Sequence, residues 1–240
     1  MEKKQLSYFV LAAFFFSLFL LSTPSDVYGK KGYPSPDRFE KAIKNFEKAD
    51  KKKAPPQGAI LCIGSSSMGG WHKHIAEDLS PLTVIKRGFG GSNMNDALHF
   101  ADRVVIPYKP RAILLYEGDN DIAQGISPQE ILQTFGAFVK KVRKALPKVR
   151  IYVLSIKPSP SRWRMWGRMM QANSLLGRVC ARYSFLTYID IATPMLNSSG
   201  KPKGDIFLSD KLHMNREGYL IWKKAVRSVL VKKELKYEKK

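Results

Sequence analysis

The chain has 240 residues, 44% of them hydrophobic, and its 41 basic and 20 acidic side chains give a formal net charge of +21. This apolar content is enough for one domain with a substantial core, which excludes a mainly disordered chain. The positive charge favours contact with an anionic envelope polymer or membrane surface, and it equally fits a solvated basic surface. Nucleic acid is not expected as a partner, because the sequence carries no nucleic-acid-binding motif.

The first 29 residues have the pattern of an export signal. Two lysines precede an uncharged apolar run over residues 6–21, and polar, turn-forming residues then lead to a small residue at Gly29. This arrangement predicts a signal peptide that is removed before Lys30, and therefore a periplasmic or secreted protein. The apolar run is close to the length that spans a bilayer, so an uncleaved membrane anchor is the alternative.

The next segment predicts a helix and a linker ahead of the main domain. Phe39, Ile43 and Phe46 recur at helical spacing within residues 35–50, and a lysine- and proline-rich stretch follows them. The expected divisions of the chain are a signal peptide or anchor, a helix with its linker, one main domain and a basic tail, at residues 1–29, 30–57, 58–233 and 234–240.

From residue 59 onward, short apolar runs alternate with longer amphipathic stretches. The runs expected to form strands are 59–63, 83–87, 111–117, 149–156 and 186–191. The stretches expected to form helices are 71–79, 93–105, 127–146, 163–183 and 215–233. Continuous apolar runs are typical of strands covered on both faces. The alternation predicts an α/β fold, a three-layer α/β/α sandwich around a mostly parallel five-stranded sheet.

The two cysteines, Cys62 and Cys180, are expected to be buried free thiols. Export would permit a disulfide between them, but Cys62 lies in the presumed central strand. Their spacing matches no metal site.

Small hydroxyl residues follow the first strand, where open α/β sheets bind their ligands. Gly64 ends the apolar run, and Ser66 lies in the serine cluster after it. A serine at this point exposes its hydroxyl near the N–H groups that open the following helix, which suits a nucleophile. Clusters of serine and glycine are more often plain turns, so this interpretation requires a base elsewhere in the chain.

Among the four histidines, His213 is the best candidate for that base. It lies in a polar loop before the last helix, three residues after Asp210, so one loop can present a carboxylate and an imidazole together. Asp210 would hold one ring nitrogen while the other faces Ser66, although an ordinary surface loop has the same pattern. Two of the other histidines are expected to point outward from the helix after the serine cluster: His72 and His74.

Two further loops at strand ends offer hydrogen-bond donors for an oxyanion. Glycines within residues 88–91 allow backbone N–H groups to approach a ligand, and Asn120 supplies a side-chain amide. Both stretches are also typical of turns. The carboxylates Glu117, Asp119 and Asp121 lack the spacing of a calcium loop, so we expect neither a metal nor another cofactor.

Together these segments resemble the motifs of the SGNH hydrolases, the superfamily of GDSL-like lipases and esterases. They occur in the order of that family, at residues 63–67, 87–92, 118–121 and 210–213. The resemblance implies a flavodoxin-like fold, with Ser66 as nucleophile, His213 as general base and Asp210 as its orienting partner. It also implies an oxyanion hole formed by the N–H groups of Ser66 and Gly91 and the amide of Asn120.

Two positions depart from the family pattern. The family usually has aspartate where this chain has Ser65 in the first motif and Ser92 in the second. Neither departure removes a catalytic group, but both change the local hydrogen bonding and so bear on substrate preference.

The expected activity is hydrolysis of a carboxylic ester by two-step acyl transfer through Ser66. Activity should fall in acid, because only a neutral His213 can accept the proton. The expected substrate is a small acyl ester, such as an acetylated glycan or a lysophospholipid; no oligomeric state is indicated. Lys157, Trp71 and Trp163 lie near strand ends and are the expected substrate contacts, with packing beneath its helix as the alternative for Trp163.

Two other functional classes are compatible with the composition. One is a catalytically silent module of the same fold that binds glycan or another envelope polymer. The other is an adhesin-like surface protein that acts through its positive charge alone. Intact Ser66, Asp210 and His213 favour the esterase over both.

Overall fold

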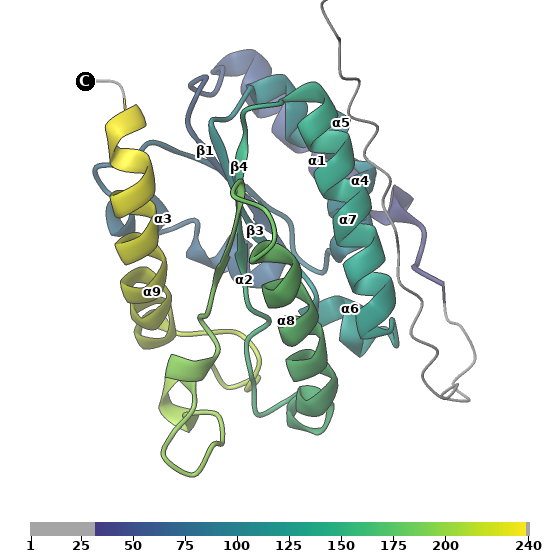
Figure 1. The fold of residues 1–240 in the computed structure, drawn as a ribbon, viewed down its shortest axis with the longest axis vertical. Coiled ribbons are helices and arrows are strands. Elements are labelled where there is room, and N and C mark those ends of the chain that lie inside the picture. Colours follow the sequence, from purple (N-terminus) through teal and green to yellow (C-terminus); the bar gives the residue numbers. More distant parts are fainter. Residues whose placement is uncertain (1–31, 239–240) are drawn as a thin grey trace, which may run out of the picture. The chain divides into compact units, whose positions relative to one another are not determined.

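A computed structural model describes residues 32–238 (Figure 1). The signal peptide or anchor expected over residues 1–29 lies outside the described residues. Within residues 32–238, no helix is both long enough and apolar enough to cross a membrane.

Five parallel strands form one sheet in the order β2-β1-β3-β4-β5. The strands are β1 (Ile60–Gly64), β2 (Val84–Gly88), β3 (Ala112–Tyr116), β4 (Arg150–Leu154) and β5 (Leu186–Ile189). Gly64 pairs with Gly88 on one side and with Tyr116 on the other, so the carboxyl ends of three strands lie level with one another. The predicted fold class, an α/β sandwich with a parallel five-stranded sheet, is confirmed.

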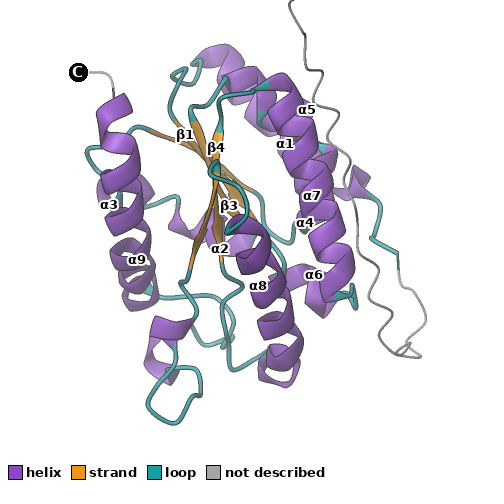
Figure 2. Ribbon diagram, viewed as in Figure 1, coloured by secondary structure: helices purple, strands orange, loops and turns teal. Residues whose placement is uncertain are grey.

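Helices cover both faces of this sheet (Figure 2). One face carries α1 (Glu40–Lys52), α4 (Met94–His99), α5 (Ala101–Val104), α6 (Asp119–Ala123), α7 (Pro128–Ala145) and α8 (Trp166–Cys180). The other carries α2 (Ser66–Trp71), α3 (Ile75–Asp78) and α9 (Arg216–Glu234). Successive strand residues divide between the two cores: Leu61 and Ile63 face the first, and Ile60 and Cys62 face the second. Burial on both faces explains why the strands read as continuous apolar runs.

Two expected helices differ from the structure, and one observed helix has no counterpart among those expected. The single helix expected over residues 71–79 is two short helices, and the first of them already begins at Ser66. The helix expected over 93–105 is interrupted at Phe100, whose ψ of 5° lies outside the helical range. The loop after β3 forms the short helix α6, which was not expected.

The N-terminal helix α1 packs on the domain. Ile43 is fully buried in the core that lies on this face of the sheet. On the exposed side of α1, Arg103 of α5 forms two ion pairs. Its Nη1 lies 2.6 Å from Glu40 Oε2, and its Nε lies 2.7 Å from Glu47 Oε1. The segment therefore belongs to the same packed unit as the sheet.

The carboxyl end of α9 is tied to the sheet by one buried carboxylate. Glu234 Oε1 accepts hydrogen bonds from Arg150 Nε (2.5 Å) and the Tyr152 hydroxyl (2.6 Å). Its Oε2 accepts from Arg150 Nη2 (2.7 Å) and from Arg111 Nε (3.3 Å), and Arg111 also pairs with Glu238. Packing thus continues through Glu238, so the start of the predicted basic tail is in contact with the sheet.

Both cysteines are buried and free, as expected. Burial raises the pKa of the Cys62 thiol well above its usual range, and it raises the pKa of Cys180 to about 12. Both thiols are therefore protonated and unreactive at neutral pH.

Candidate active site

The candidate site lies where the strand order reverses. From β1 the chain passes to β2 on one side of it and then to β3 on the other. In doubly wound sheets the loops on the two sides of such a switch point diverge and leave a crevice at the carboxyl ends of the strands. Ser66 follows β1 and Asn120 follows β3, so both residues lie at this position.

The structure brings Ser66, His213 and Asp210 together from two distant segments. His213 Nε2 lies 2.9 Å from Ser66 Oγ, and His213 Nδ1 lies 2.5 Å from Asp210 Oδ2. Asp210 Oδ1 also accepts the backbone N–H groups of Leu212 and His213, each at 2.9 Å. The hydrogen bond to the His213 ring, together with these backbone bonds, lowers the pKa of Asp210 below its usual range. Asp210 is therefore an anion that holds the imidazole with its other nitrogen facing Ser66.

The loop that carries Asp210 and His213 is constrained at several points. A backbone bridge between Phe207 and Met214 closes its base. Lys211 adopts a left-handed φ of 56°, which bends the chain between the carboxylate and the imidazole. The Ser161 N–H donates to the Lys211 carbonyl oxygen at 3.0 Å and ties this loop to the segment after β4. These contacts fix the loop that presents the acid and the base.

The turn after β1 presents Ser66. A Cβ at Gly64 would lie 2.3 Å from the Tyr116 carbonyl oxygen, so only glycine allows β1 and β3 to approach so closely here. The helix begins two residues later at Ser66, whose side chain is half-buried. A Cβ at Gly90 would lie 3.7 Å from Ser66 Cβ, which places the glycine loop after β2 beside the Ser66 side chain.

The two other predicted oxyanion donors follow β2 and β3, with Gly91 in the glycine loop and Asn120 in the first turn of α6. Asn120 accepts from Arg162 Nη1 through Oδ1 (3.0 Å) and donates from Nδ2 to the Ser92 carbonyl oxygen (2.8 Å). These contacts set which way the amide faces, and its second hydrogen has no partner among the described residues. Gly91 has a φ of 89°, a conformation that favours glycine, and it packs beside the Phe39 ring of the N-terminal segment.

Replacement of Asn120 by alanine is expected to lower kcat about a hundredfold with little change in KM, because an oxyanion donor acts mainly in the transition state. Steady-state kinetics on a small chromogenic acetate ester measure the effect. The matched control is Asn45→Ala, which removes an exposed amide from α1. Activity of the Asn120 variant within about twofold of the wild type would remove this residue from the site.

The acidic residues after β3 have structural partners. Asp119 lies between Lys157 Nζ (3.3 Å) and Arg162 Nη1 (2.7 Å). Burial alone would raise the pKa of Asp119, but the two cations outweigh it and lower this pKa. Asp121 accepts the Gly118 N–H at 3.0 Å, and its burial raises its pKa to about 6. Within residues 32–238, no group of three or more acidic, His or Cys side chains is arranged to hold a metal ion.

Ser92, one of the departures from the family pattern, donates its hydroxyl to Glu117 Oε1 at 2.6 Å. Burial, followed by the nearby charge of Asp121, raises the pKa of Glu117 well above its usual value. An aspartate in place of Ser92 would add another buried carboxylate to this pair. The serine instead supplies a donor to Glu117 and, through its carbonyl oxygen, an acceptor to Asn120.

Lys157, an expected substrate contact, is fully buried. Its Nζ lies 3.3 Å from Asp119 Oδ2 and donates to the Leu212 carbonyl oxygen at 2.9 Å. The ammonium group therefore connects the segment after β3 to the loop that carries His213. The prediction that Lys157 contacts substrate is wrong.

The two tryptophans of the same prediction also pack against protein. Trp71 is fully buried, and its Nε1–H donates to Asp78 Oδ2 at 2.7 Å, so its predicted substrate contact is wrong. Trp163 is half-buried and stacks on Trp166, with ring centroids 6.0 Å apart. This arrangement matches the packing alternative for Trp163.

Arg162 is the cation that does lie beside the candidate site, whereas Lys157 was the preferred prediction among the basic residues after β4. Arg162 and Lys157 both follow β4, and two prolines stand between them. The available signal was a basic side chain at the carboxyl end of a strand, which both residues share. Which of the two reaches Asn120 depends on the path of the loop, and their order in the chain does not indicate this.

His72 does not point outward as expected. Its Nε2 accepts the Gly88 N–H at 3.0 Å, which joins α2 to the start of the glycine loop. Burial, followed by the charges of Lys86 and Arg87, lowers the pKa of His72 to about 4 from an ordinary value of 6.5. The folded protein therefore favours the neutral ring.

The lowered pKa of His72 predicts a pH-dependent stability. The unfolded chain binds a proton here before the folded chain does, so the contribution of His72 is complete above about pH 6.5 and is lost as the pH falls towards about 4. Between about pH 7.5 and about pH 4.5, urea unfolding should show the wild type losing about 1–2 kcal/mol more than His72→Gln, after allowance for partial exposure. Glutamine keeps an acceptor but does not titrate. Equal losses in the two proteins would contradict the assignment.

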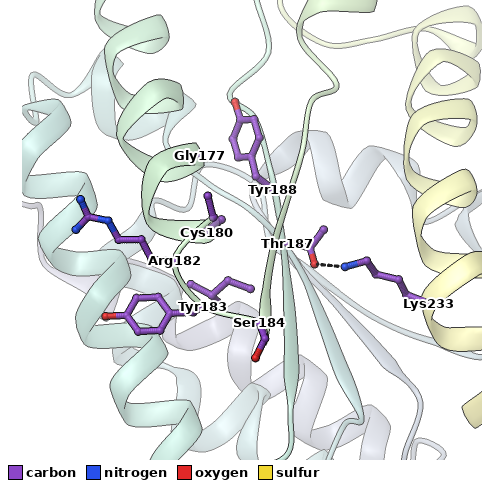
Figure 3. A pocket seen from close by; sticks show the side chains of 10 residues that line it. Gly177, Cys180, Arg182, Tyr183, Ser184, Thr187, Tyr188 and Lys233 are labelled. Atoms are coloured by element: carbon purple, nitrogen blue, oxygen red, sulfur yellow. Dashed lines mark hydrogen bonds between the residues drawn. The ribbon is translucent and has the colours of Figure 1, made fainter. Parts of the chain in front are cut away.

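A separate hollow of about 560 Å³ lies along the edge strand β5. Figure 3 shows Cys180, Arg182, Tyr183 and Tyr188 around it, with Thr187 Oγ1 accepting from Lys233 Nζ at 3.0 Å. None of Ser66, His213 or Asp210 lines it. We therefore assign the chemistry to the residues at the switch point and not to this hollow.

Comparison with solved structures supports the fold. A candidate platelet activating factor from Streptococcus pneumonia is 20% identical, with a TM-score of 0.71, over 81% of this chain and 93% of that one. A GDSL-like lipase from Bacteroides thetaiotaomicron is 18% identical, with a TM-score of 0.67, over 79% and 97%. A variant of an acetyl-xylooligosaccharide esterase from Geobacillus Stearmophilus is 15% identical, with a TM-score of 0.59, over 72% and 93%.

A comparison with curated proteins found no match. Residues 56–221, more than half of the chain, match the model of the GDSL-like lipase/acylhydrolase family. This match confirms the resemblance carried by the four motifs. The match also includes the candidate nucleophile, its base and both loops beside them. The chain therefore belongs to the GDSL-like lipase/acylhydrolase family.

Proposed function

We propose that this hydrolase is a serine esterase that cleaves small carboxylic esters by two-step acyl transfer. The observation that carries the proposal is the continuous contact from Asp210 through His213 to Ser66, at 2.5 Å and 2.9 Å. A serine hydroxyl is a weak nucleophile on its own, and it is activated by an oriented base of this kind. The same three groups recur in acyl-transfer enzymes of unrelated folds.

In the first step, Ser66 Oγ attacks the ester carbonyl carbon while His213 Nε2 accepts its proton. The N–H groups of Ser66 and Gly91 and the amide of Asn120 stabilise the resulting oxyanion. The bond to the alcohol oxygen then breaks, and His213 returns the proton to the leaving alcohol. In the second step, water attacks the acyl–serine ester while His213 accepts its proton. The bond between the acyl carbon and Ser66 Oγ then breaks, His213 returns the proton to Ser66, and the carboxylic acid is released.

The substrate class we propose is a short acyl ester of an envelope component. The acetyl-xylooligosaccharide esterase among the structural neighbours favours an acetylated glycan. A lysophospholipid, whose acyl chain is long, is the second candidate. The apolar run and small-residue exit within the first 29 residues support an enzyme that acts outside the cytoplasm, either released or anchored.

Purified protein incubated with 4-nitrophenyl esters of increasing acyl length tests this function. We expect turnover that is greatest for the short acyl chains, together with acetate release from an acetylated oligosaccharide. Folded protein that binds the oligosaccharide but hydrolyses none of these esters would instead indicate a silent binding module.

A further inference from the structure

Arg162 lies beside the candidate oxyanion hole and is only partly used by it. Its Nη1 donates to Asn120 Oδ1 at 3.0 Å and to Asp119 Oδ1 at 2.7 Å. Nη2 and Nε have no hydrogen-bond partner among residues 32–238. The side chain is 18% exposed, whereas Lys157 on the same carboxylate is fully buried. One end of the guanidinium is therefore bound to the protein, and the other is available.

The charge around Arg162 is not balanced. Asp119 is the one carboxylate that pairs with both Lys157 and Arg162 among the described residues. Lys157 is otherwise satisfied by the Leu212 carbonyl oxygen, which carries no formal charge. Lys157, Asp119 and Arg162 together therefore have a net positive charge, and Arg162 is the partly exposed residue of the three. A guanidinium always keeps its charge and presents donors in a planar fork that matches carboxylate and phosphate oxygens.

The position of Arg162 indicates which part of a substrate it would meet. Arg162 follows Ser161, whose N–H is bonded to the loop that carries His213. In the proposed reaction His213 protonates the leaving alcohol. Arg162 thus lies between the Asn120 amide, which its side chain contacts, and the loop whose His213 protonates the leaving alcohol, and this placement favours contact with the alcohol portion of the ester.

From this geometry we infer that Arg162 binds an anionic group on the alcohol portion of the substrate, a carboxylate or a phosphate. The inference rests on the proposed esterase function and narrows its substrate class. A structural role alone, holding the Asn120 amide, requires one donor and no charge. That role would affect neutral and anionic esters equally, which separates the two possibilities.

The test compares three acetate esters: neutral phenyl acetate, 4-acetoxybenzoate and 4-acetoxyphenyl phosphate. The kcat/KM of each variant is divided by that of the wild type on the same ester, so differences in leaving-group reactivity between the esters cancel. Arg162→Gln should lower kcat/KM on at least one anionic ester about tenfold more than on phenyl acetate. The anionic ester on which kcat/KM falls further shows whether Arg162 binds a carboxylate or a phosphate. The matched control is Arg164→Gln, an equal loss of charge at an exposed residue nearby, which should affect all three esters alike.

Equal losses on all three esters in Arg162→Gln would overturn the inference. A binding measurement keeps the inference separate from the esterase proposal. Calorimetric titration of 4-acetoxybenzoate and of 4-acetoxyphenyl phosphate into Ser66→Ala, with and without Arg162→Gln, should show about tenfold weaker binding of at least one anion in the double variant. Identical binding overturns the inference whether or not the protein is catalytic, whereas a wild type that hydrolyses none of the esters contradicts the esterase proposal alone.

Discussion

Replacement of Ser66 by alanine, or of His213 by alanine, is expected to lower turnover of a small activated ester about a thousandfold or more. Without the hydroxyl no acyl–serine intermediate can form, and without the imidazole the hydroxyl keeps its proton. The two groups act as a unit, so the double variant should be scarcely slower than either single variant. Single-turnover kinetics at saturating ester separate this loss from any change in binding.

Two controls isolate the chemistry from general effects of substitution. Ser184→Ala and His99→Ala remove an exposed hydroxyl and an exposed imidazole away from the candidate site, and both should retain full turnover. The Ser66 variant should also unfold at the same urea concentration as the wild type, because Ser66 is only half-buried. A folded Ser66→Ala protein with turnover within about tenfold of the wild type would rule out this nucleophile.

Replacement of Glu234 by alanine should lower the free energy of unfolding more than any other substitution proposed for this protein. The side chain is fully buried and accepts hydrogen bonds from Arg150, Arg111 and Tyr152. Its removal leaves two cations and a hydroxyl near the core without their shared acceptor. Breaking a buried ion pair by removing one partner costs about 3–5 kcal/mol.

Urea unfolding at neutral pH measures this effect as a lower free energy of unfolding. Glu217→Ala is the matched control, because it makes the same change on the same helix at an exposed residue. It should cost less than about 1 kcal/mol, mainly through the loss of a favourable charge in the first turn. A loss below about 1 kcal/mol for Glu234→Ala as well would mean that the buried network contributes little.

Local patterns were sufficient where one physical cause determines the structure. The apolar runs around Leu61 and Ile113 form central strands because only residues without polar groups can be covered on both faces. Ser127 and Glu130 form the capping box that their spacing predicts at the start of α7, and the helix ends close to the predicted residue. The carboxyl ends of parallel strands share one edge, which is why the sequence alone predicts that Ser66 and Asn120 belong to one site.

Side-chain direction is what the patterns did not reveal. Lys157 and Arg162 are both basic residues after β4, yet the first is buried under Leu212 and the second reaches Asn120. His72 and Trp71 occupy one turn of a helix whose start at Ser66 was not expected, so the faces that they present were assigned wrongly. In each case the outcome depends on contacts between segments far apart in the chain, which hydrophobic periodicity does not encode.

The proposed reaction requires that Ser66 is a nucleophile activated by His213. Treatment of the purified protein with a fluorophosphonate, followed by peptide mass spectrometry, tests this requirement. We expect one covalent adduct, located on Ser66, and none in the His213→Ala variant under the same conditions. An unmodified Ser66 in folded wild-type protein, or an adduct formed equally well without the imidazole, would contradict the proposed reaction.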